Sequence, residues 1–190
     1  MSREEPDVAQ SIPANPAAIV DLLNSRAHGI APALPDTLDN PRTASKILRP
    51  FGLPEGGQPA PSLITQVREL RAALLDAVTA SEPQATAAAW TRITRHSGSV
   101  TLRQTFAAPG QVRLQQIDGD PVIGGITLAV AELITDGTWQ RIRACANEDC
   151  AHAFYDTTRS RTQRWHSYES CGNRNNVATY RARKRARSTC

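Results

Sequence analysis

The stretch that decides the architecture of this chain is CANEDC, residues 145–150, followed fifteen residues later by HSYESC, residues 166–171. Each segment begins and ends on a residue that can bind a metal, with four residues between: Cys145 and Cys150, then His166 and Cys171. Zinc prefers four tetrahedral ligands of this kind, and a closely spaced pair can wrap one side of the ion. The spacing therefore predicts one zinc ion held by these four residues.

Three thiolates and one neutral imidazole fill all four coordination positions, so we expect a structural ion and no catalysis at it. Two other residues compete as ligands. His152 lies only two positions after Cys150, and Cys190 stands at the end of the sequence, 19 positions beyond Cys171. Both are placed less well than His166 to complete a second pair. A segment with this little apolar content should depend on the metal for its fold.

Charge is distributed unevenly along the 190 residues. Residues 141–190 hold 11 of the 22 Lys and Arg residues and only four acids, a net charge of +7, whereas residues 1–140 have a net charge of −3. Such a split indicates a basic unit with an anionic partner, attached to a neutral-to-acidic body. The four cysteines fit a reducing compartment, in which thiolate ligands are more common than disulfides.

The basic residues concentrate in a helix and in a loop. Asn173 is suited to cap a helix over residues 174–187 whose arginines recur on one stripe, and the width of such a helix fits the major groove of B-DNA. Arginines also alternate with hydroxyl residues between the two ligand pairs, a mixture typical of phosphate contacts. The candidate nucleic-acid-binding residues are Arg159, Arg161, Arg164, Arg174, Arg181, Lys184 and Arg185. The alternative is a solvated basic tail that contacts nothing specific.

The upstream part predicts a mostly helical α+β domain. Apolar residues at three- and four-residue steps indicate helices over about 15–26, 42–48, 62–78, 83–95 and 121–136. Alternation around the loop Ala107–Gly110 predicts a β-hairpin with one buried face. No segment has the length or composition of a signal peptide or a transmembrane helix, so we expect a cytoplasmic protein.

The run RWHSYESCGNR, residues 164–174, resembles the CGNR-type zinc finger of bacterial regulators, and the likeness extends from Arg143 to about Arg185. The upstream portion looks like the ABATE domain that usually precedes this finger in proteins described as stress-induced transcription regulators. This resemblance implies zinc and DNA. The family normally has cysteine where this chain has His166; imidazole is a competent zinc ligand, so the difference bears on the affinity for the metal and not on its identity.

The expected organisation is a flexible N-terminus (1–14), an ABATE-like α+β domain (15–140), a CGNR-type zinc finger (141–187) and a frayed C-terminus (188–190). The function we expect is zinc-dependent DNA binding by a bacterial transcription regulator. Its N-terminal domain would sense a small-molecule effector or mediate assembly, for example as a homodimer. The alternative is a zinc module that binds RNA or protein without operator specificity. We expect no enzyme, because the titratable residues of the body form no known catalytic constellation.

Overall fold

The computed structural model describes residues 14–27, 35–147, 149–177, 180 and 184. They form an α+β fold that is mostly helical, with two small antiparallel strand pairs, as the sequence predicts. In chain order the elements are α1 (Ala14–Asn24), η1 (Thr37–Asp39), α2 (Pro41–Leu48), η2 (Arg49–Phe51), α3 (Pro61–Thr79), α4 (Pro83–Ser97), β1 (Thr101–Ala108), β2 (Gln111–Asp118), α5 (Pro121–Thr135), η3 (Trp139–Arg141), β3 (Ile142–Ala144), β4 (Ala153–Tyr155) and η4 (Tyr168–Gly172).

The helices begin where the sequence supplies a cap and a proline. The side chain of Asn40 accepts a hydrogen bond from an N–H group of the first turn of α2, and Asp120 does the same for α5. Each of these residues is followed by a proline, which lacks the N–H that a first turn leaves unpaired. The five predicted helices of the body are therefore confirmed, with ends that differ by one or two residues from the expected ones.

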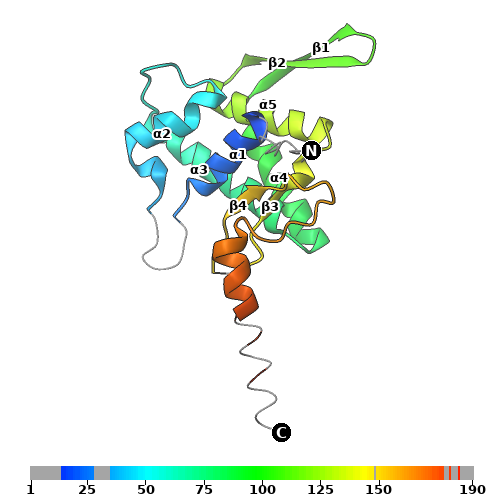
Figure 1. The fold of residues 1–190 in the computed structure, drawn as a ribbon. Coiled ribbons are helices and arrows are strands. Elements are labelled where there is room, and N and C mark those ends of the chain that lie inside the picture. Colours follow the sequence, from blue (N-terminus) through cyan, green and yellow to red (C-terminus); the bar gives the residue numbers. More distant parts are fainter. Residues whose placement is uncertain (1–13, 28–34, 148, 178–179, 181–183, 185–190) are drawn as a thin grey trace, which may run out of the picture.

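One buried core joins the body to the C-terminal strands (Figure 1). Helix α3 packs against α4 and α1, and α1 packs in turn against α5, with Leu22, Leu74 and Ile126 fully buried. Ile142 of β3 and Tyr155 of β4 belong to the same cluster. The hydrophobic core therefore continues across residue 140, where the net charge of the sequence changes sign.

The β1–β2 hairpin is present, but the predicted burial of one of its faces is wrong. Its apolar side chains are exposed, Phe106 to 79% and Val112 to 53%. The hairpin projects from the body in Figure 1, and only its base is seated. There the side-chain amide of Gln116 donates to the carbonyls of Gly119 and Asp120 at 3.0 Å. Alternation in the sequence shows that a strand has two different faces, but it does not show that another element covers one of them.

Two aspartates of the body, Asp36 and Asp39, take part in ion pairs with arginines of α3. Arg71 is buried and donates to both carboxylate oxygens of Asp36, at 3.0 and 2.5 Å, and to the hydroxyl of Ser25 at 2.7 Å. Asp39 pairs with Arg68. These contacts tie the end of α1 and the start of η1 to α3. In the described part of the chain, no helix is both long and apolar enough to cross a bilayer.

Candidate metal centre

The structure brings together the four residues that the sequence predicts as ligands. The Sγ atoms of Cys145, Cys150 and Cys171 and a ring nitrogen of His166 lie within 4.8 Å of one another. The Nδ1 atom of His166 is 3.4 Å from the sulfur of Cys150 and 3.7 Å from that of Cys171. An ion bound tetrahedrally at about 2.3 Å from sulfur and about 2.0–2.1 Å from nitrogen would place these atoms about 3.6 Å apart. The donor set therefore fits zinc in both chemistry and size.

The first ligand pair is shaped by a tight turn. The carbonyl of Asn147 accepts the N–H groups of Cys150 (2.9 Å) and Ala151 (3.3 Å). Ala151 has a φ of +49°, in the left-handed region, which reverses the chain toward β4. The side-chain amide of Asn147 also donates to the sulfur of Cys171 at 3.6 Å. One asparagine therefore closes the first turn and contacts a ligand of the second.

The second ligand pair depends on the single π-helical turn Tyr168–Gly172, capped by Ser167. The carbonyl of Ser167 accepts the N–H of Cys171 at 3.0 Å, which holds that thiol toward the cluster. A side chain at Gly172 would place its Cβ only 2.7 Å from the ring of Tyr168. A larger residue directly after the last ligand would therefore force the Tyr168 ring to move.

Cys150 and Cys171 differ in acidity because their hydrogen-bond partners differ. Burial raises the pKa of Cys150 to about 11, and the negative charges of the neighbouring thiolates act in the same direction. Burial also acts to raise the pKa of Cys171, but hydrogen bonds, the one from Asn147 first among them, bring it below its usual value. A cation among these sulfurs would displace the remaining protons, as expected for a thiolate metal site.

Helix α1 supports the site from outside, which the sequence reasoning missed. The side-chain amide of Asn24 donates to the carbonyl of Ala153 (2.9 Å) and accepts the N–H of Ala153 (2.8 Å). The same amide lies 3.1 Å from Nε2 of His152, and Arg26 donates to the carbonyl of Ala151. The ring of His152 packs on that of His166 at 4.5 Å between centroids. His152 is therefore placed behind a ligand and lies outside the four-residue cluster.

Asp156 organises the arginine-rich loop, a role that the sequence analysis did not assign. Its side chain is fully buried. One carboxylate oxygen accepts the N–H of Thr158 (2.9 Å), and the other accepts the N–H of Gln163 (3.0 Å) and contacts Arg143 (3.3 Å). Burial acts to raise the pKa of Asp156, but these hydrogen bonds hold it below its usual value. An ionised carboxylate thus fixes both ends of the loop.

The predicted nucleic-acid-binding residues lie on and beside this scaffold. Arg159, Arg161 and Arg164 are exposed on the loop, and the guanidinium of Arg164 lies 5.2 Å from the centre of the Trp165 ring. Arg174 is exposed on the helical segment 173–177, which projects from the body in Figure 1. Lys184 is exposed as well, whereas Arg181 and Arg185 lie outside the described residues.

Two aromatic residues of this region pack on each other. Trp165 contacts Tyr168 edge to face, with ring centroids 6.1 Å apart. The hydroxyl of Tyr168 accepts a hydrogen bond from the side-chain amide of Asn176 at 3.2 Å. Tyr168 is nonetheless 62% exposed. These contacts favour a packing role for both rings.

Comparison with protein families identifies both parts of the chain. The ABATE family, described as "Putative stress-induced transcription regulator", matches residues 17–137, and the CGNR zinc finger family matches residues 141–184. The chain belongs to the ABATE family. It carries a CGNR zinc finger directly after the ABATE domain. A search of curated proteins returned no match.

The four-residue cluster is the zinc site of the CGNR finger, and it supports one structural zinc ion. His166 takes the fourth place in this finger with Nδ1 directed toward two of the sulfurs. When bound, the ion would link the turn after β3 to the π-helical turn before segment 173–177. The ABATE domain and the CGNR finger meet between residues 137 and 141, inside a continuous core.

Proposed function

We propose that this ABATE-family protein is a zinc-dependent DNA-binding regulator of transcription, whose CGNR finger contacts duplex DNA. The observation that supports this proposal is the joint placement of the metal cluster and the arginines. The turn that carries Cys171 leads directly into the exposed helical segment with Arg174, and Asp156 holds a second group of exposed arginines nearby. Guanidinium groups on a rigid base suit phosphate oxygens and guanine edges.

Electrostatics in the described part of the finger favours a polyanion. Between residues 157 and 177 the arginines are exposed, and the one acidic residue in that range is Glu169. Asp156, just before this range, is neutralised by its buried contact with Arg143. Residues 157–177 therefore carry an excess of exposed positive charge, which attracts phosphates.

Binding to duplex DNA, followed by fluorescence anisotropy at rising salt, tests this function. If about six phosphates are neutralised, affinity should fall by ~10³ between 50 and 200 mM salt. Arg174→Ala should reduce the slope of log affinity against log salt by about one. Arg103→Ala in the projecting hairpin is the matched control, because it removes the same charge from an element outside the finger.

Absent or salt-insensitive binding would reject the proposal. An enriched motif in a selection from random duplex DNA would support a regulator with a defined operator. Equal affinity for single-stranded RNA and a flat selection profile would favour an RNA-binding module instead.

The same ligand set supports a non-catalytic role for the metal. Four protein ligands complete a tetrahedral shell, and a catalytic zinc keeps one position for water or substrate. We propose further that the ABATE domain senses a ligand or mediates assembly. Chemical crosslinking and mass measurement of the purified protein would test assembly directly.

A further inference from the structure

The two strands of the CGNR finger nearest the body have unequal outer edges. In an antiparallel pair, hydrogen-bonded and non-hydrogen-bonded residue pairs alternate. Cys145 donates its N–H to the carbonyl of His152 at 2.8 Å, so these two form a hydrogen-bonded pair. The preceding pair, Ala144 opposite Ala153, is therefore a non-hydrogen-bonded pair, and its backbone groups point away from the partner strand.

The outer edge of β4 is covered. Both backbone groups of Ala153 are bound by the side chain of Asn24, as described above. The outer edge of β3 is open at Ala144: among the residues that the structure describes, its N–H and carbonyl groups have no hydrogen-bond partner, whereas the N–H of Ile142 is bound by Trp139 and that of Ala146 by Arg164. An unpaired N–H and carbonyl on a strand edge can pair with the backbone of another extended segment.

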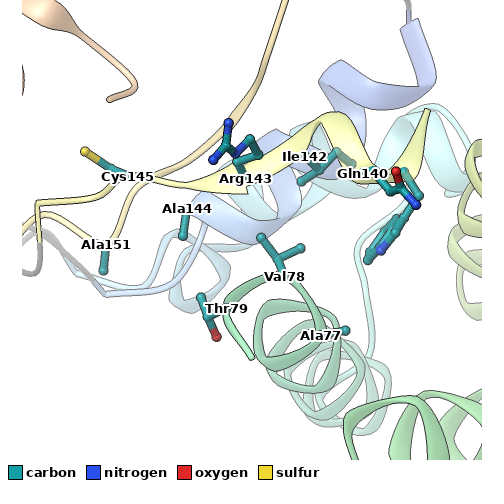
Figure 2. Close-up of a pocket in the computed structure, with 10 residues that line it drawn as sticks. Ala77, Val78, Thr79, Gln140, Ile142, Arg143, Ala144, Cys145 and Ala151 are labelled. Carbon is teal, nitrogen blue, oxygen red and sulfur yellow. The ribbon is translucent and has the colours of Figure 1, made fainter. Parts of the chain in front are cut away.

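A groove of about 590 Å³ runs along this uncovered edge (Figure 2). Figure 2 shows Val78 and Thr79 on the last turn of α3 below the strand, with the Arg143 guanidinium on the opposite side of it. A second cavity of about 370 Å³ shares Trp139 and Gln140 with the first and adds Trp90 and Ile134. The volumes lie in the range of ligand-binding cavities, roughly 300–1,000 Å³.

The lining excludes several classes of ligand. Around the two cavities, the described lining residues include Arg143, which is paired with Asp156, and the zinc ligand Cys145; their other side chains are uncharged. A ligand of the groove would therefore be recognised by the backbone groups of Ala144 at one end and by the apolar surface of Trp90 and Trp139 at the other. The second cavity is bounded by the tilted ring pair Trp90–Trp139, with centroids 5.4 Å apart. A nucleic acid or a strongly charged metabolite does not match this lining.

We infer that the groove binds a short, uncharged, extended peptide segment of a partner protein. The segment pairs with the free edge of β3 as a third strand, its backbone bonding to Ala144, and rests on the last turn of α3. It places one bulky apolar side chain against Trp90 and Trp139. Addition of a strand to a sheet edge, with side-chain pockets that give specificity, is an established mode of peptide recognition. This inference does not depend on DNA binding.

The test uses the full-length, zinc-loaded protein and a phage-displayed library of random peptides. We expect enriched peptides with a central apolar residue. Ala144→Pro should weaken their binding about tenfold or more, since it removes the outward N–H and hinders strand pairing. This N–H takes no part in the β3–β4 ladder, so zinc content should not change. Ala144→Ser, which keeps the N–H, is the matched control.

N-methylation of single peptide bonds in an enriched peptide gives a test that leaves the protein unaltered. Binding should be lost for alternate positions only, because every second peptide N–H faces β3. A library without enriched peptides would overturn the inference. So would peptides that bind Ala144→Pro as tightly as the wild type, or that tolerate N-methylation at every position.

Discussion

A single asparagine links the two families that meet in this chain. Asn24 ends α1 in the ABATE domain, and its amide occupies the outer edge of β4 in the CGNR finger. Through His152 it also supports the ring of His166. Residues that hydrogen-bond to a metal ligand or pack behind it orient that ligand, and their loss commonly lowers the affinity for the metal. The last residue of α1 therefore supports the metal site from behind.

Asn24→Ala should lower the affinity for zinc by roughly 10-fold, since second-layer partners of metal ligands typically contribute 10–100-fold. The measurement is a competition titration of the purified protein with a chromophoric chelator. Asp21→Ala, an exposed position on the same helix, is the control and should leave the affinity unaltered. An unchanged affinity in Asn24→Ala would show that the contact serves packing alone.

The Asp36–Arg71 pair makes the stability of the body dependent on pH. Burial acts to raise the pKa of Asp36, but the hydrogen bonds from Arg71 hold it below its usual value. A lowered pKa in the folded state stabilises the protein above the unfolded pKa of about 3.9, and this contribution is lost as the pH falls through the folded value.

Asp36→Asn should therefore destabilise the protein at pH 7, and the difference in unfolding free energy from the wild type should shrink below about pH 4. Urea unfolding of both proteins at several pH values measures this difference, and any loss of zinc in acid affects both alike. Glu55→Gln, an exposed residue of the loop after η2, is the control. A difference that stays constant across the pH range would contradict the assignment.

At the scale of elements, the sequence predicts features set within one segment, such as helices and ligand pairs. It misses features that depend on residues far away in the chain, such as short strands and their edge contacts. The caps at Asn40 and Asp120 and the apolar stripe of α3 act within one element, so these helices could be predicted. The ligand set could also be predicted, because paired ligands at short spacing are a local pattern. The strands β3 and β4 are three residues each, which is too short for a periodic signal. The outer edge of β4 is covered by the side chain of Asn24, 129 positions away from Ala153.

The exposed β1–β2 hairpin and the buried stripe of α3 should respond differently to substitution. Phe106→Ser should change the free energy of unfolding by less than about 0.5 kcal/mol, because an exposed side chain loses little contact. Leu74→Ala, in the buried stripe of α3, should cost about 2–5 kcal/mol. Urea unfolding monitored by circular dichroism measures both. A large loss for Phe106→Ser would mean that another surface covers this face in solution.

At the scale of the whole molecule, one part of the CGNR finger belongs to the core of the body and another part lies outside it. Its strands β3 and β4 share the hydrophobic core of the ABATE domain through Ile142, Ala153 and Tyr155. The turns that carry Cys150, His166 and Cys171 are outside this core. The sequence predicts metal dependence for the whole basic segment, whereas the packing predicts it for this outer layer of turns alone.

Removal of zinc should therefore unfold the outer layer alone. After treatment with a strong chelator, hydrogen exchange measured by mass spectrometry should rise sharply in peptides covering 146–151 and 164–177. Peptides covering β3, α3 and α5 should keep their protection, because their burial does not involve the metal. Cys171→Ser should reproduce this pattern without chelator. Loss of protection throughout the chain would show that the ion holds the entire core together, and protection that survives unchanged in 164–177 would exclude a structural metal at these four residues.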